Sequence, residues 1–114
     1  MPGTKFSTDV RALAELTIVD LHGDINRDAQ SGLETAYRQA EERGLPVALN
    51  FTDTDYINST GIAVIVGILA MARTKGISVR AFGLSDHYRR IFEITRLSDF
   101  MTVHTDQQAA LAAG

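Results

Sequence analysis

The sequence predicts an α/β fold: a single domain, residues 1–114, with a central, mostly parallel β-sheet, an N-terminal antiparallel hairpin and about four helices. After the first two strands, short β-prone segments alternate with longer segments of helical periodicity, which is typical of parallel sheets with right-handed crossovers. Only Ala14-Glu15 separates the first two strand candidates, and so short a connection favours a hairpin. A hydrophobic content of 45% in 114 residues is enough for one core.

The first half of the chain begins with two strands, predicted over residues 5–13 and 16–21, and His22-Gly23-Asp24 is expected to end the second. A helix over residues 29–43 follows, capped by Asn26 or Asp28 and ended by Gly44. The next strand is predicted over residues 47–51. The buried face of this helix is predicted from five residues at helical spacing: Ala29, Leu33, Ala36, Tyr37 and Ala40.

The longest apolar segment, Gly61 to Ala72, contains no charged or polar side chain. It is too long for an ordinary strand and too short for the roughly 20 residues that span a bilayer, so it predicts a buried helix and no direct membrane insertion. Ser59 or Thr60 is expected to cap its start, and Gly76 to end it.

The last third of the chain repeats the alternation, with strands predicted over residues 78–84 and 101–104. The helix between them is capped by Ser85 or Asp86 and is expected to bury apolar residues, namely Tyr88, Ile91, Phe92 and Leu97. Thr105 and Gln108 have the spacing of a capping box at the start of a final helix over residues 106–113.

The composition excludes several functions. Eleven Lys and Arg residues against 14 Asp and Glu, with a net charge of −3 and no basic cluster, argue against nucleic acid as a ligand. The absence of cysteine excludes disulfides, thiolate nucleophiles and Cys-based zinc sites. The N-terminal residues lack the apolar core of a secretory signal, so we expect a cytoplasmic protein.

The functional site is expected where the carboxyl ends of the parallel strands meet, which gathers residues 22–26, 52–60 and 83–86. Ser59 lies in the middle of that end. A hydroxyl at a helix start faces free N–H groups and a partial positive charge, and such a site can hold a phosphoryl group. The alternative interpretation is that Ser59 and Thr60 only cap the helix.

No metal, cofactor or catalytic residue is predicted. The three histidines, His22, His87 and His104, lack paired metal-ligand spacing, and Asp53 and Asp55 lack the later residues of a calcium loop. The Gly-x-Ser-x-Gly turn of hydrolases is absent, so an enzyme is not expected. A small phosphate-ligand binder remains an alternative.

Three stretches together resemble the STAS domain of anti-sigma factor antagonists: LHGDIN, YINSTGIAVIVGIL and SVRAFGLSDHYRRIFEITRLSDFMTVH. The resemblance covers about residues 6–111. It implies a regulatory protein-binding module whose partner is an anti-sigma factor serine kinase. In that family the kinase phosphorylates a hydroxyl residue of an Asp-Ser-Ser/Thr-Gly turn, which switches the antagonist off, and a serine phosphatase restores it. Another assembly, such as a stress-sensing scaffold or a lipid-transport complex, is the alternative setting.

By position, the resemblance implies that Ser59 is the phosphoacceptor, with Thr60 as the alternative. Two residues depart from the family's pattern, because Asn58 and Asn26 stand where an aspartate is usual. Each change removes a carboxylate but keeps a hydrogen-bonding group of similar shape. The partner-binding residues implied by the resemblance are Asp24, Asn26, Asn58, Ser59, Thr60 and Gly61.

Overall fold

A computed structural model describes residues 4–113 of the chain, so residues 1–3 and 114 of the predicted single domain lie outside the described part. The strands are β1 (Ser7–Ala12), β2 (Thr17–Ile25), β3 (Val47–Ile57), β4 (Val79–Phe82) and β5 (Thr102–His104). The helices are α1 (Gln30–Glu41), α2 (Ser59–Lys75), α3 (Asp86–Ile94) and α4 (Gln107–Ala112), with short 3-10 turns η1 (Arg27–Ala29) and η2 (Leu97–Asp99).

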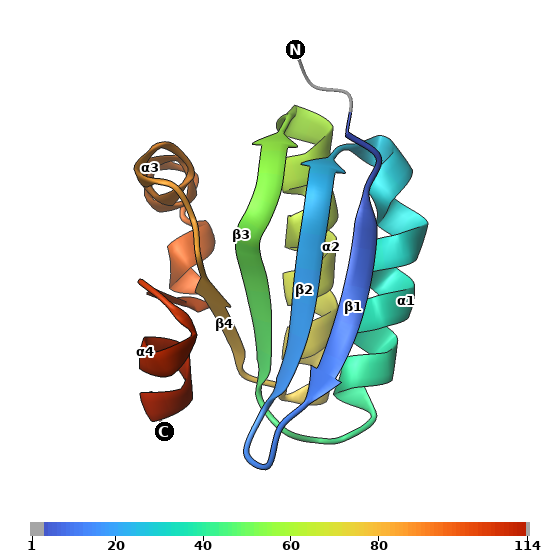
Figure 1. The fold of residues 1–114 in the computed structure, drawn as a ribbon, viewed down its shortest axis with the longest axis vertical. Helices are drawn as coiled ribbons and strands as arrows, with labels where there is room; N and C mark the ends of the chain where they lie inside the picture. The colour runs from blue at the N-terminus through green and yellow to red at the C-terminus, as the bar shows by residue number, and fades with distance from the viewer. Residues whose placement is uncertain (1–3, 114) are drawn as a thin grey trace.

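The five strands form one sheet in the order β1-β2-β3-β4-β5. β1 pairs with β2 antiparallel, and every later pairing is parallel. Figure 1 shows α1 and α2 behind β1 to β3, with α3 and α4 grouped beside β4. The predicted fold class, a mostly parallel sheet with an N-terminal hairpin and four helices, is confirmed.

Both faces of the sheet are covered in part. The larger core joins one face to α1, α2 and α3, and it contains the expected α1 residues Leu33 and Tyr37 and the α3 residue Phe92. The smaller cluster lies on the other face, where Ala110 of α4 packs near Phe82. The helix α4 has only six residues, and in Figure 1 no helix lies in front of β1 and β2.

Two strands are longer than the sequence predicted. β2 continues through His22-Gly23-Asp24 to Ile25, and β3 continues through the polar residues 52–56 to Ile57. The extensions pair with each other, and β3 contains one residue more than β2 at two places, which are β-bulges. The prediction followed side-chain polarity, whereas the extensions are held by backbone pairing.

Two helix caps also differ from the prediction. The side chain of Asn58, rather than Ser59 or Thr60, caps α2. Asp106 caps α4 by accepting a hydrogen bond from the amide of Ala109, so the expected capping box of Thr105 and Gln108 is wrong. In both cases a short side chain with an acceptor oxygen, the amide of Asn58 or the carboxylate of Asp106, lies immediately before the first helical residue, which is the preferred cap position.

A buried ionic group ties the hairpin to the rest of the sheet. Asp20 on β2 accepts two hydrogen bonds from Arg11 on β1, at 2.6 and 2.9 Å. It accepts a third from Asn50 on β3, at 2.7 Å. Burial alone would raise the pKa of Asp20, but the bonds from Arg11 and Asn50 outweigh it, so this pKa lies below its ordinary value. Arg11 also contacts Gln107 of α4.

No helix within residues 4–113 combines the length and the hydropathy that a membrane span would need.

Candidate functional site

The central turn lies between the ends of β2 and β3 and the start of α2. The amide of Asn58 donates a hydrogen bond to the carbonyl of Ile25 at 3.3 Å. Ile25 is paired with Ile57, and Asp24 with Tyr56. The ends of the two strands therefore bring Asp24 of β2 next to the turn that opens α2. Both places carry residues for which the family resemblance implies partner binding.

Asn58 fixes the shape of the turn. Its Oδ1 accepts one hydrogen bond from the amide of Gly61 at 2.8 Å and a second from the hydroxyl of Thr60 at 2.8 Å. An asparagine at this position satisfies one free N–H of the helix start as an aspartate would, but without adding a negative charge.

The two hydroxyls of the turn differ in their contacts. The Thr60 hydroxyl is engaged by Asn58, whereas the Ser59 hydroxyl makes no hydrogen bond within residues 4–113. Both residues are exposed. Ser59 is the first residue of α2, so its hydroxyl lies at the positive end of the helix dipole. A phosphoryl group on Ser59 would find the helix amides nearby.

Gly61 allows α2 to start against the end of β2. A Cβ at this position would lie 2.0 Å from the carbonyl oxygen of Ile25 and 3.1 Å from a methyl group of Ile57. No real Cβ approaches a backbone atom so closely, so only glycine fits here without a shift of the helix or the strand.

Asp24 and Asn26 are the remaining two residues for which the resemblance implies partner binding. Asp24 is 5% exposed, and its Oδ1 is buried and accepts no hydrogen bond within residues 4–113. Asn26 caps the turn η1 by accepting a hydrogen bond from the amide of Asp28 at 2.9 Å. Both residues line a hollow of about 300 Å³ together with Lys5 and Phe6. A donor that entered this hollow would find the Asp24 carboxylate as a hydrogen-bond acceptor in its wall.

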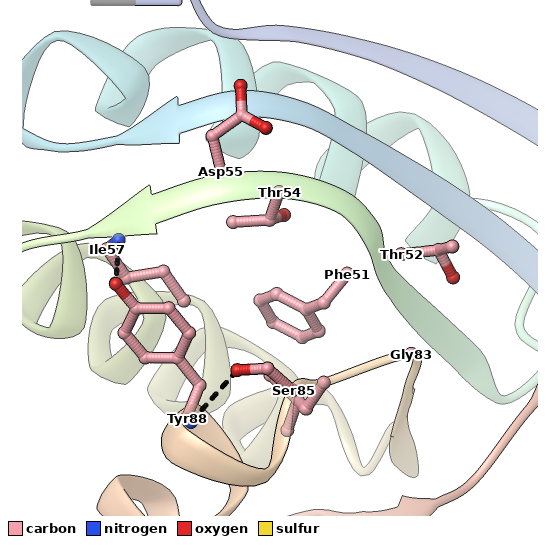
Figure 2. A pocket seen from close by; sticks show the side chains of 9 residues that line it. Phe51, Thr52, Thr54, Asp55, Ile57, Gly83, Ser85 and Tyr88 are labelled. Carbon is pink, nitrogen blue, oxygen red and sulfur yellow. Dashed lines mark hydrogen bonds between the residues drawn. The ribbon is translucent and has the colours of Figure 1, made fainter. Parts of the chain in front are cut away.

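Tyr88 holds the turn from the other side, a role that the sequence did not indicate. Its hydroxyl accepts a hydrogen bond from the amide of Ile57 at 2.9 Å, as Figure 2 shows. Ser85 caps α3 by accepting from the amide of Tyr88. The two residues line a hollow of about 190 Å³ between β3 and α3, together with Thr52 and Gly83. The predicted gathering of residues 52–60 and 83–86 is thus confirmed.

Removing the hydroxyl in Tyr88→Phe should lower the free energy of unfolding by about 1–2 kcal/mol, because the part-buried amide of Ile57 would lose its acceptor. Urea denaturation measures this loss, and hydrogen exchange should become faster at Ile57. The matched control is Tyr56→Phe, since Tyr56 is exposed and its hydroxyl makes no hydrogen bond within residues 4–113. Equal stability of the two variants would contradict this role of Tyr88.

Within residues 4–113, no three His, Cys, Asp or Glu side chains are grouped in a way that could hold a metal ion. His22 lies between Asp9 and Asp53, with ring nitrogens 3.1 and 3.2 Å from their carboxylates. His104 contacts the hydroxyl of Thr102.

Sequence comparison matches residues 7–110 to the family model described as the STAS domain. The anti-sigma-B factor antagonist of Listeria monocytogenes is 37% identical over 62 residues, which are 54% of this chain and 54% of that protein. The match thus spans about half the length of that relative. The anti-sigma-B factor antagonist of Bacillus subtilis is 27% identical over 93 residues, which are 82% of this chain and 85% of that protein.

Solved structures share the fold. An anti-sigma factor antagonist from Mycobacterium paratuberculosis superimposes with a TM-score of 0.78 at 16% identity, covering 96% of this chain and 93% of that one. The Bacillus cell fate determinant SpoIIAA in its phosphorylated form gives a TM-score of 0.68 at 17% identity, covering 96% and 100%.

Proposed function

The chain belongs to the STAS domain family, and we propose that it acts as an anti-sigma factor antagonist. In this role it binds a kinase-type anti-sigma factor in the cytoplasm and thereby frees the sigma factor. Curated relatives named anti-sigma-B factor antagonist support the regulatory role. The proposed activity is binding, with no reaction catalysed by this chain.

The observation that carries the proposal is the exposed hydroxyl of Ser59 at the first position of α2, which makes no hydrogen bond to any residue in the described range 4–113. A kinase can reach this oxygen without breaking a hydrogen bond of the turn. Thr60, the alternative acceptor, would first have to give up its bond to Asn58. We therefore favour Ser59 as the phosphorylated residue.

Phosphorylation at Ser59 would add a charge of about −1.5 to −2. The positive end of α2 would stabilise that charge in the free protein. In an interface, however, the phosphoryl group would have to lose its water, which is costly without a matching cation. The modified protein would therefore release the anti-sigma factor.

Asn58 and Asn26 make this turn less negative than an aspartate-containing one. Both side chains keep the cap contacts that shape the site. Lower negative charge should reduce repulsion of an incoming phosphoryl group and should also remove carboxylate ligands for any metal at the kinase or phosphatase step. Binding of the partner depends on shape and hydrogen bonding, which the asparagines retain.

Asp24 is proposed to contribute to the same interface. Its Oδ1 is buried and accepts no hydrogen bond from the described residues 4–113, and Asp24 directly precedes Ile25, whose carbonyl contacts the turn. A hydrogen-bond donor of the partner that entered the hollow lined by Asp24 and Asn26 would bond to this carboxylate, and desolvated polar pairs of this kind are worth more than exposed ones.

The test is to purify the protein from its own host and to measure its intact mass before and after phosphatase treatment, with fragmentation to locate any phosphate. Phosphate on Ser59 and co-purification of an ATP-binding anti-sigma factor are expected. Phosphate on Thr60 would correct the residue. If the protein stayed unmodified under several growth conditions and co-purified with a scaffold or transport complex instead, the proposal would be wrong.

A further inference from the structure

β1 is an open edge of the sheet. It pairs with β2 in an unbroken antiparallel register from Ser7 to Ala12, and nothing pairs with its other side within residues 4–113. Unlike many edge strands, it has neither proline nor a bulge. An edge of this kind can accept another strand.

The free backbone groups of this edge can be identified. Leu13 donates a hydrogen bond to Leu16 across the hairpin at 3.0 Å. Because the direction of backbone groups alternates along an antiparallel strand, the odd-numbered residues of β1 bond to β2. Thr8, Val10 and Ala12 therefore present their N–H and C=O groups at the open side.

A groove runs along this edge between β1 and α1, with a volume of about 430 Å³. It is lined on the strand by Thr8, Asp9 and Val10, and on the helix by Ser31, Gly32, Thr35, Ala36 and Gln39. The helix side carries no charge, and most of its residues are small. Side chains of an added strand would point into this groove at every second position.

The position of α1 favours a single extended segment over a second copy of this chain as the occupant of the groove. Because the groove is lined by both elements, α1 reaches the open side of β1, and Figure 1 shows the helix running along that side. In a two-fold pairing of β1 with a second copy, the second α1 would need the same space. A single extended segment needs no such space.

The charged residues of β1 indicate which charges the bound segment should carry. The side chains of Asp9 and Arg11 contact His22 and Asp20 of β2, and because alternate residues of a strand point to opposite faces, they lie on the face opposite Val10, which packs against the larger core. Opposite charges placed directly across two strands are favourable, and like charges are unfavourable. An antiparallel segment would match this edge with an acidic residue opposite Arg11 and a basic residue opposite Asp9.

We propose that the groove between β1 and α1 binds an extended segment of a partner protein as a sixth, antiparallel strand. The segment has the pattern acid-x-base, with x and the flanking groove-facing positions small or β-branched and uncharged. No residue of the Ser59 turn lines this groove, so the proposal does not depend on the proposed function.

The probe is an acetylated and amidated peptide, Thr-Val-Glu-Val-Lys-Val-Thr, titrated into isotope-labelled protein and followed by NMR. Its central Val would lie opposite Val10. We expect shifts at Thr8, Val10 and Ala12, and slower hydrogen exchange of their amides. A peptide with Glu and Lys exchanged should bind at least about fivefold more weakly, because both charge pairs become repulsive.

Two variants test whether the peptide binds in the groove between β1 and α1. Thr8→Pro removes one outward N–H without touching the bonds to β2, and Thr35→Trp fills the groove; each should abolish the shifts. Thr74→Trp, on the exposed side of α2, is the matched control and should bind normally. The proposal is overturned if millimolar peptide causes no NMR shifts, or if binding survives in both variants. It is also overturned if the peptide with exchanged charges binds equally well, or if the free protein dimerises through β1.

Discussion

Ser59→Asp is expected to bind the anti-sigma factor about 10- to 100-fold more weakly than the unmodified protein, whereas Ser59→Ala should bind with unchanged affinity. The Ser59 hydroxyl makes no hydrogen bond within residues 4–113, so its removal should leave the turn intact. A carboxylate at the same position would have to be desolvated in the interface, and a penalty of about 1.4 kcal/mol already changes affinity tenfold.

Calorimetry with the purified anti-sigma factor measures both affinities. Phosphorylated protein should bind still more weakly than Ser59→Asp, because a phosphoryl group carries more charge than a carboxylate. Ser78→Asp is the matched control, since Ser78 is exposed and precedes β4 at the opposite end of the sheet. Equal affinity of Ser59→Ala and Ser59→Asp would contradict a phosphorylation switch at this residue.

Thr60 provides a second control on the same turn. Thr60→Val removes the hydroxyl that donates to Asn58 but keeps the shape of the side chain. The cap bond from Gly61 to Asn58 remains. If Ser59 is the phosphoacceptor, this variant should still be phosphorylated and still be switched off.

The arrangement of strands and helices could be predicted from the sequence because it depends on hydrophobic periodicity, which is local. The buried residues of α1, such as Leu33 and Tyr37, follow directly from their spacing. The length of β3 could not be predicted in this way. Residues 52–56 are polar, yet their backbone pairs with β2, and backbone pairing between distant segments leaves no mark in side-chain polarity.

The site could be predicted in its position but not in its hydrogen bonding. Ser59 and Thr60 are plausible caps by residue type, and Asn58 is an equally good one; only the direction of the chain leaving β3 decides among them. The contact of Tyr88 with Ile57 joins residues far apart in the sequence. A tyrosine at helical spacing among apolar residues gives no sign that its hydroxyl holds a strand end.

Gly61→Ala is expected to destabilise the protein by about 3 kcal/mol or more, whereas Gly67→Ala on the same helix should stabilise it by about 0.5–1 kcal/mol. Both changes add one methyl group to α2 and reduce the flexibility of the unfolded chain equally. They differ in surroundings. The new methyl at Gly61 would lie 2.0 Å from the carbonyl of Ile25, while nothing lies within 4 Å of a Cβ at Gly67.

Urea denaturation of the two variants therefore isolates the contact between the start of α2 and the end of β2. If Gly61→Ala folds, α2 must shift away from Ile25, which would weaken the bond from Asn58 to Ile25 and move Ser59. Its binding of the anti-sigma factor should then fall together with its stability, while Gly67→Ala should bind normally. A Gly61→Ala variant as stable as Gly67→Ala would show that this contact does not position the turn.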